Sequence, residues 1–438
     1  MSCKRKPALV SAVLYLSCVL CGLRSGFASA YLLNLEGGIE TPGALYAQAP
    51  NGRLVKLLQR GASAPQGGTI SDIGVPALAP DGSVIFGAEV TEPDKIEWRI
   101  FQVNPLSHEP RVEPLLDDRP MNLGCRPALK IDPRLSTGAD GSVAFVGNEE
   151  RGGAALFHYA KMGVDCEVRA GDRTAQGHLI ANLGFGSAQT SGDGFIVLQA
   201  HIFLGPGKDL CQTRSAILLA RQGKPPLEIA VEGNRSPDSD HYGAHFGLPA
   251  IAQVDGEIMV AFTNHNPHGS FLFLGQPDDL HAVLSPTSRP LPGPPVFLAE
   301  GRPSIAPDGS LAIVTESGAN SLILTIRTGE SFVVAHASDQ HGSDQEFTGL
   351  GDPVQATKGT VYAEAVGRGD SLDRLYSFSF SRGFKNASSA LSSANAEVFP
   401  GSLAVDATGR YAFLARTPEH QRQPVISHPP HLQQGRSI

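Results

Sequence analysis

One pattern of apolar and polar positions recurs along most of the chain. Its clearest copy is PSIAPDGSLAIV at residues 303–314, where a short apolar segment, an Asp-Gly pair and a second apolar segment follow one another. Close copies stand at residues 76–86 and 138–146. An Asp-Gly pair between two apolar segments is a strong signal for a β-hairpin with a tight turn. The pattern therefore predicts a series of hairpins.

Seven such turns follow one another at intervals of 50 to 62 residues. They are Asp81-Gly82, Asp140-Gly141, Asp193-Gly194, Asp255-Gly256, Asp308-Gly309, Lys358-Gly359 and Thr408-Gly409. Between them lie outer hairpins of matching form, of which residues 216–233 and 321–337 are the clearest. A period of this size with an all-β unit is typical of a β-propeller built from four-stranded blades. The 49 glycines and 33 prolines fit many short strands joined by turns.

The two ends of the repeat array complement each other. Residues 44–61 have the form of an outer hairpin but no inner hairpin precedes them, whereas residues 402–416 have the inner form and no outer hairpin follows. Pairing them closes a ring, and closure removes the exposed sheet edges that an open array would carry. We therefore predict an all-β fold, a single seven-bladed β-propeller over residues 31–417 whose N-terminal strands close the last blade. Six or eight blades are the alternatives.

Closure of the ring also predicts where the loops lie. In a four-stranded meander the turns between the first and second strands and between the third and fourth strands share one face. The remaining links share the other face. The short Asp-Gly turns belong to the first face, and the long segments 201–214, 234–246, 264–269 and 338–349 belong to the second. Propellers carry function on loops held by a rigid scaffold, so we expect the ligand on this long-loop face.

The APDGSVIF and APDGSLAIV copies resemble the propeller repeats of the TolB type, in which a Pro-Asp-Gly turn precedes an apolar strand. The longer unit at residues 57–90 is similar to the repeats of an uncharacterised group of secreted bacterial proteins. Gly171-Asp172 matches that group's Gly-Asp element, whereas Gly61-Ala62 departs from it. These motifs specify turns and core strands. The resemblance therefore implies fold and export, and it implies no catalytic residue.

The first thirty residues have the layout of a cleavable secretory signal. A basic start at residues 4–6 precedes an apolar run at residues 8–23, and Ala28-Ser29-Ala30 stands before Tyr31. The apolar run is short for a membrane span, which needs roughly 20 residues. We predict a signal peptide at residues 1–30, export to the periplasm or the extracellular space, and no stable membrane insertion after cleavage. Residues 418–438 are polar and broken by proline, and we expect a disordered tail.

The net charge of the chain limits the kinds of molecule that it can bind. Removal of residues 1–30 takes away four basic and no acidic residues, which leaves 43 acidic against 31 basic residues and a formal charge of −12. This acidic balance argues against nucleic acid as a partner.

Three cysteines would remain after removal of residues 1–30. They are Cys125, Cys166 and Cys211, which allow one disulfide with three choices of pair. Buried, unpaired thiols are the other interpretation.

Motifs for catalysis are missing from the sequence: there is no G-x-S-x-G, no H-E-x-x-H and no phosphate-binding glycine loop. Histidines and acids instead gather in two loops of the fourth blade, SPDSDHYGAHFG and NHNPHG. These loops contain Asp238, Asp240, His241, His245, His265 and His268. His241, His245 and His265, with Asp240 behind them, could form a divalent-metal site or a general base. A solvated polar loop is the simpler interpretation, and the sequence predicts no cofactor beyond this metal.

The turn aspartates also admit two interpretations. Asp81, Asp140, Asp255 and Asp308 recur at one position, where an aspartate before glycine caps local backbone N–H groups and tolerates the dihedral angles that the turn requires. A ring of metal-binding carboxylates is the alternative.

For the function of the protein, we favour a non-enzymatic extracytoplasmic propeller that binds a protein or a surface polymer through its long-loop face. The alternative is a propeller hydrolase or lyase that uses the blade-four histidines.

Overall fold

The computed structural model describes most of the chain between residues 43 and 416. The described residues are 43–49, 53–107, 110–115, 128–131, 134–149, 153–160, 163–205, 213–237, 241–290, 301–316, 320–325, 327, 329–337, 347–356, 359–367, 373–379, 383–388 and 397–416. The predicted signal peptide and tail, Asp238 and Asp240 lie outside them. Every regular element in the described part is a β-strand, and no helix there could cross a membrane.

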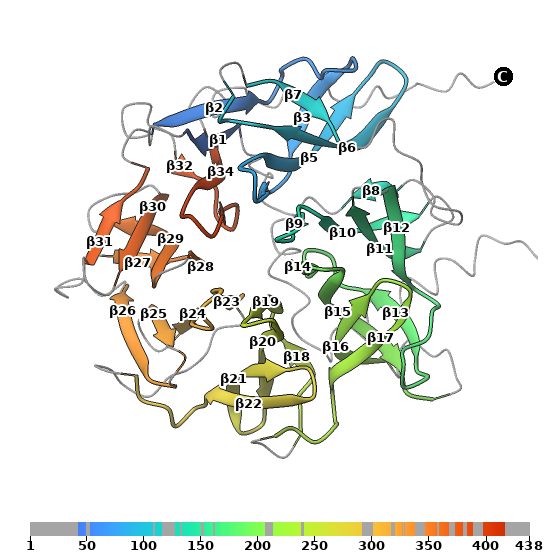
Figure 1. The fold of residues 1–438 in the computed structure, drawn as a ribbon, viewed down its shortest axis with the longest axis vertical. Helices are drawn as coiled ribbons and strands as arrows, with labels where there is room; N and C mark the ends of the chain where they lie inside the picture. Colours follow the sequence, from blue (N-terminus) through green and yellow to red (C-terminus); the bar gives the residue numbers. More distant parts are fainter. Residues whose placement is uncertain are drawn as a thin grey trace, which may run out of the picture.

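Seven antiparallel sheets stand in a ring, so the predicted seven-bladed propeller is confirmed (Figure 1). Blade 1 contains β3 (Thr69–Ile73), β4 (Ala77–Leu78), β5 (Val84–Thr91), β6 (Ile96–Val103) and β7 (Val112–Pro114). Blade 2 contains β8 (Ala128–Ile131), β9 (Ser136–Thr137), β10 (Val143–Glu149), β11 (Ala154–Ala160) and β12 (Gly163–Arg169). Blade 3 contains β13 (Leu179–Leu183), β14 (Gln189–Gly192), β15 (Phe195–Phe203), β16 (Thr213–Arg221) and β17 (Lys224–Val231).

The other four blades follow the same plan. Blade 4 contains β18 (His245–Phe246), β19 (Ala250–Val254), β20 (Glu257–Asn266), β21 (Gly269–Gln276) and β22 (Asp279–Leu284). Blade 5 contains β23 (Ser304–Ile305), β24 (Leu311–Glu316), β25 (Asn320–Thr325) and β26 (Ser331–His336). Blade 6 contains β27 (Phe347–Leu350), β28 (Val354–Gln355), β29 (Thr360–Gly367), β30 (Asp373–Ser379) and β31 (Gly383–Asn386). Blade 7 contains β32 (Glu397–Val398), β33 (Ala404–Val405) and β34 (Tyr411–Arg416) from the C-terminal end of the array.

Blade 7 is completed by the N-terminal strands β1 (Ala44–Gln48) and β2 (Leu54–Gln59). The β1 strand pairs with β34 in antiparallel register from Ala44↔Ala415 to Ala47↔Ala412, and β2 then forms the outer edge. The predicted closure is therefore correct. The ring is held shut by main-chain hydrogen bonds between segments that stand more than 360 positions apart in the sequence.

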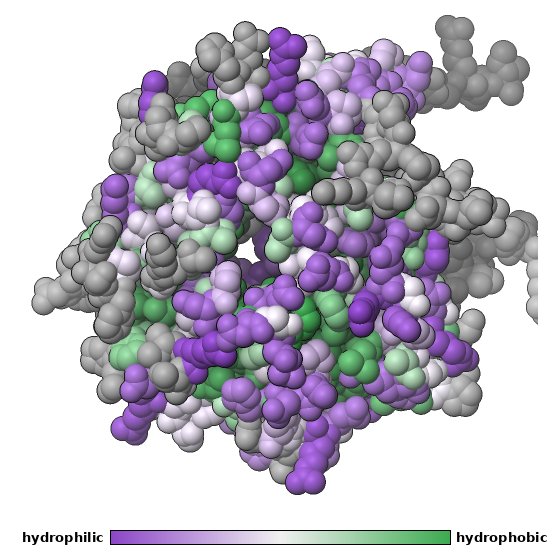
Figure 2. All heavy atoms as spheres, viewed as in Figure 1, coloured by the Kyte–Doolittle hydropathy of each residue, from purple (hydrophilic) through white to green (hydrophobic). Residues whose placement is uncertain are grey.

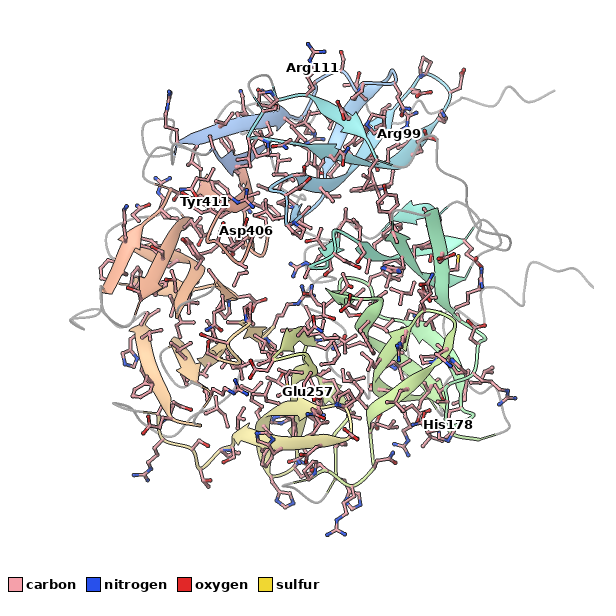
Figure 3. All side chains as sticks on the ribbon, viewed as in Figure 1. Arg99, Arg111, His178, Glu257, Asp406 and Tyr411 are labelled. Atoms are coloured by element: carbon pink, nitrogen blue, oxygen red, sulfur yellow. The ribbon has the colours of Figure 1, made fainter. Side chains whose placement is uncertain are left out.

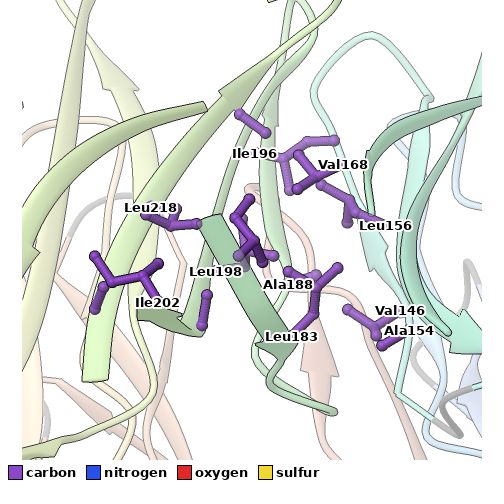
Figure 4. Packing of buried hydrophobic residues seen from close by; sticks show 14 of the residues in the cluster. Val146, Ala154, Leu156, Val168, Leu183, Ala188, Ile196, Leu198, Ile202 and Leu218 are labelled. Carbon is purple, nitrogen blue, oxygen red and sulfur yellow. The ribbon is translucent and has the colours of Figure 1, made fainter. Parts of the chain in front are cut away.

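The core lies between neighbouring blades. Strands alternate their side chains between two faces, and each face packs on the blade beside it. Between blades 2 and 3, for example, Leu156 and Val168 pack against Ile196 and Leu198, all at most 1% exposed (Figure 4). Burial of each such side chain is worth about 1.5–3 kcal/mol. Seven clusters of this kind arise because the second and third strands read as almost continuous apolar runs.

The predicted turns are present at the six positions where both residues are described, and the glycines of all seven have a positive φ of 66° to 88°. The carboxylate Oδ1 of Asp81, Asp140 and Asp308 accepts the backbone N–H two residues ahead, at 2.8, 3.0 and 3.0 Å. Asp193 and Asp255 differ, since they adopt positive φ themselves, as in the mirror-image hairpin turn. Capping is therefore confirmed for Asp81, Asp140 and Asp308, and Asp255 adopts the unusual dihedral angle that its turn requires.

One feature of the innermost strands was not predicted. In six blades this strand is split into two segments, such as β3 and β4, by a short interruption that contains glycine or proline. At the interruption, a backbone N–H donates to a carbonyl of the second strand, as Gly74 does to Gly87 and Gly351 does to Glu364. Proline cannot donate to the ladder, and glycine tolerates the close backbone approach. The interruptions border the centre of the ring (Figure 1).

Candidate functional site

The structure brings two of the predicted site residues together on blade 4. His245 on β18 and His265 on β20 are direct cross-strand partners. Side chains of such partners leave the sheet on the same side, with Cβ atoms about 5 Å apart. The two histidine loops therefore meet at the long-loop end of one sheet, as the return of the chain through Asp255-Gly256 implies.

Asparagine side chains hold the main chain of these loops in place. Asn264 accepts the N–H of Gly243 at 2.8 Å and donates to the carbonyls of Gly243 and His245 at 3.0 and 2.9 Å. Asn266 donates to the carbonyl of His241 at 3.1 Å. A Cβ on Gly243 would lie 1.9 Å from the carbonyl oxygen of His265, so only glycine permits this approach. Amide hydrogen bonds are thus sufficient to fix the backbone of the loop.

The imidazoles themselves lie near the surface. His241 is exposed, and the Nδ1 of His265 lies 2.8 Å from the Ser270 hydroxyl. Asp240, the proposed supporting carboxylate, and Asp238 lie outside the described residues. Within the described ranges, no three His, Cys, Asp or Glu side chains are grouped as a metal site would require.

The loop that precedes β18, at residues 234–244, lines a cavity between the outer parts of blades 3 and 4. Its volume is about 490 Å³. One wall is formed by β17 and Gln176, and the other by the loop at residues 234–237, Tyr242 and the turn between β21 and β22. Tyr242 anchors the loop, because its ring packs on Phe246, Phe262 and Phe273 with centroid distances of 5.3 to 6.1 Å. The longest predicted loop of blade 4 is therefore ordered where it borders this cavity.

A second polar region surrounds the axis, where the space-filling view shows an opening bordered by hydrophilic residues (Figure 2). Arg134 of blade 2 donates to the carbonyl of Gly401 in blade 7 at 2.6 Å. Arg302 of blade 5 donates to the carbonyl of Gly186 in blade 3. Each bond joins blades that are separated by another blade. Both guanidinium groups must therefore lie along the inner wall of the ring.

Other chemical groups accompany these arginines. The backbone N–H of Arg302 donates to Oδ1 of Asp352 in blade 6 at 3.3 Å. Phe185, in the interruption of the innermost strand of blade 3, is 44% exposed. Cationic, anionic and aromatic side chains thus occur together at the level where the innermost strands are interrupted.

Sequence reasoning missed this axial group, although a signal was present. The tripeptide Gly-x-Pro stands before the inner hairpin in four blades. It forms the interruption in three of them, Gly74-Val75-Pro76, Gly247-Leu248-Pro249 and Gly351-Asp352-Pro353, and in blade 5 it precedes β23 as Gly301-Arg302-Pro303; the order along the chain is Val75, Leu248, Arg302 and Asp352 for the middle residue. The middle residue is apolar in the first two and charged in the last two. An alignment of the repeats on this element, rather than on the Asp-Gly turns, would have identified Arg302 and Asp352 as departures from the repeat.

Cys166 on β12 forms a disulfide bond whose partner lies outside the described residues. Of the two interpretations that the sequence left open for this cysteine, the disulfide is the correct one.

No model of a known protein family matches the chain, and the curated sequences contain no match to it. Solved structures are similar in fold at low sequence identity. The acylaminoacyl peptidase of Pyrococcus horikoshii is 9% identical with a TM-score of 0.44, over 76% of this chain and 48% of the peptidase. The α-L-arabinanase of Penicillium chrysogenum is 10% identical with a TM-score of 0.37, over 75% of this chain and 98% of the enzyme. The sialidase of Trypanosoma rangeli is 11% identical with a TM-score of 0.38, over 74% and 59%. The chain thus spans about half the length of the peptidase. The seven-sheet ring itself places the protein in the class of β-propellers.

Proposed function

We propose that the protein is a non-enzymatic, extracytoplasmic β-propeller that binds a protein or a surface polymer through its long-loop face. The observation that carries this proposal is the difference between the two faces. Four of the short turns are closed by backbone hydrogen bonds from Gly82, Gly141, Gly309 and Gly409, and in the first three the turn aspartate also accepts a backbone N–H. The long links on the opposite face hold the histidine loops, and one of them, with residues 234–237 and Tyr242, contributes part of one wall of the cavity between blades 3 and 4. Binding residues occur preferentially on such loops.

Two observations support export. The N-terminal thirty residues have the layout of a secretory signal. Cys166 forms a disulfide, and disulfides persist in oxidising compartments outside the cytoplasm.

A second candidate function rests on the pairing of His245 with His265. Two imidazoles at one sheet edge are a starting point for a metal site or a general base, which a hydrolase or lyase would need. The binding function is preferred because the described contacts of the histidine loops are made by Asn264, Asn266 and Ser270.

The test compares the two faces in one binding assay. Fluorescently labelled protein is titrated onto cell envelopes of the native host. A long-loop variant, Arg235→Ala with His241→Ala, should bind at least about tenfold more weakly, as expected when central contact residues are truncated. A short-turn control, Gln222→Ala with Lys224→Ala, replaces two exposed residues near the turn between β16 and β17 and should bind like the wild type. Equal loss in both variants, or loss in the control alone, would contradict the proposal.

A further inference from the structure

The interface between blades 6 and 7 contains one buried carboxyl group, that of Glu364, and further acidic groups that are partly buried. Tyr362 and Glu364 on β29, together with Asp373 on β30, face Tyr411 on β34 and its neighbours in blade 7. Blade 7 is also the blade that both ends of the array build together. Figure 3 labels Asp406 and Tyr411 on blade 7. We call this interface the 6–7 seam.

Glu364 is the most deeply buried acid of the seam, at 2% exposure. Its two carboxylate oxygens accept the backbone N–H groups of Gly401 and Ser402, at 2.7 and 3.1 Å. A Cβ on Gly351 would approach Oε2 of Glu364 to 2.9 Å, so the space behind the carboxylate is filled by backbone. The carboxylate therefore links β29 to the interrupted innermost strand of blade 7 without contact to solvent.

The equivalent position in blade 3 shows what a neutral side chain does there. The backbone carbonyl of Gln199 on β15 accepts the N–H of Gly184, just as the backbone carbonyl of Glu364 accepts the N–H of Gly351. The side-chain amide of Gln199 then donates to the carbonyls of Phe246 and Gly247 in blade 4, at 2.7 and 2.9 Å. Both residues bridge their blade to the innermost strand of the next one. Only the bridge of Glu364 can gain or lose a proton.

The charges that face the 6–7 seam are mostly negative. Blade 6 contributes Asp352, Tyr362 and Asp373 beside Glu364, and blade 7 contributes Glu397 with Arg416, Asp406 with Arg410, and Tyr411. Arg134 of blade 2 reaches the seam from the channel side, at the carbonyl of Gly401. Glu397 and Asp406 have arginine partners of their own, whereas the described contacts of Glu364 are to backbone N–H groups.

Burial raises the pKa of Glu364 to about 7, and the charges of Asp352 and Asp373 add to this rise, against the N–H groups of Gly401 and Ser402. Burial also raises the pKa values of Asp373, Tyr362 and Tyr411. A carboxyl whose pKa is higher in the folded than in the unfolded state stabilises the fold at acidic pH. This contribution is lost as the pH rises from the unfolded value of 4.5 through the folded value.

We propose that the 6–7 seam is a pH-sensitive contact, which is tight while Glu364 is protonated and loosens when it ionises. Ionisation places a charge that only two backbone N–H groups contact among the described residues in a buried position near the half-buried Asp352 and Asp373, and opening the seam hydrates it. Arg134 donates to the backbone carbonyl of Gly401, and the backbone N–H of Gly401 donates to the Glu364 carboxylate. The seam is therefore linked directly to the wall of the central channel. The device senses pH changes in the surroundings of the ring.

Hydrogen–deuterium exchange of the segment at residues 397–405, corrected for intrinsic rates, measures the opening of the seam. With a pKa of about 7 in the closed state and 4.5 in the open state, the opening equilibrium should increase by about 30-fold between pH 5.5 and pH 8.5. The segment at residues 245–250, which Gln199 holds, is the internal control and should change less than twofold. In Glu364→Gln the pH dependence at residues 397–405 should disappear.

A second variant keeps the test decisive if Glu364→Gln does not fold. Asp373→Asn removes a neighbouring negative charge, so the midpoint of the exchange transition should move to lower pH. A pH-independent segment 397–405 in the wild type, a transition that persists in Glu364→Gln, or an unmoved midpoint in Asp373→Asn would each overturn the proposal.

Discussion

Truncation of Leu45 tests whether the N-terminal strand really closes the ring. Leu45 lies on β1, is 0% exposed, and is paired with Leu414 of β34. It packs in the cluster between blades 7 and 1, with Leu414 and Phe86 among its members. Leu45→Ala removes this contact while the backbone pairing can persist.

The expected cost follows from burial. A buried leucine loses its transfer free energy on truncation, and the cavity left behind adds to the loss, so Leu→Ala substitutions cost about 2–5 kcal/mol. Complete burial of Leu45 places the change near the upper half of this range, at about 3–4 kcal/mol. Domains are stable by about 5–15 kcal/mol, so the effect should be large. Leu227→Ala is the control, because Leu227 is 37% exposed, and its cost should stay below about 1 kcal/mol.

Urea unfolding followed by tryptophan fluorescence provides the assay. Trp98, the only tryptophan, lies on β6 of blade 1 and packs in the core between blades 1 and 2, so it does not report on β1 directly. If β1 closes a cooperative ring, Leu45→Ala lowers the unfolding midpoint seen by Trp98 and by circular dichroism alike. Deletion of residues 31–61 should leave an insoluble or unfolded product, because it exposes the edge of β34. An unchanged midpoint at Trp98 in Leu45→Ala, or a soluble deletion variant with unchanged melting, would refute the closure argument.

Three further predictions concern the turns, the N-terminus and the histidines. Asp140 accepts hydrogen bonds from the Ser142 hydroxyl and N–H and from the Asp193 N–H, which lower its pKa although burial alone would raise it. Asp140→Ala should therefore cost about 1 kcal/mol at pH 7 in urea titrations, with the difference from wild type vanishing as the pH falls below the usual carboxyl range; a pH-independent difference would contradict it. Mass spectrometry of protein from the native host should find a chain that begins at Tyr31, and an intact Met1 in the membrane fraction would disprove export. Metal analysis of purified protein should show less than one transition metal per chain, and removal of metal with a chelator should leave envelope binding unchanged within each of the wild type, His241→Ala and His265→Ala; a stoichiometric, tightly bound metal would favour the enzymatic alternative.

Much of the fold was predictable because each blade repeats a local signal. An Asp-Gly pair between apolar segments has few alternatives to a hairpin, and seven copies at one period leave the propeller as the natural arrangement. Pairing of residues 44–61 with residues 402–416 was predictable for the same reason, since each half lacked what the other had. The split innermost strand was not, because β4, β9 and β33 are two residues long and carry no periodicity of their own.

The sequence by itself predicted a propeller of seven blades with six or eight as alternatives, its closure, the turn chemistry of the aspartates and the neighbouring positions of the loops that carry His245 and His265, because hairpins follow from turns and alternation over a few residues. Only the tertiary structure decided that Arg134 and Arg302 reach across the ring and that Glu364 is buried in the 6–7 seam. Those contacts join residues 267, 116 and 37 or 38 positions apart. Their chemistry depends on desolvation by neighbouring blades, and a charged residue in a strand gives no local sign of whether the next blade covers it or water does.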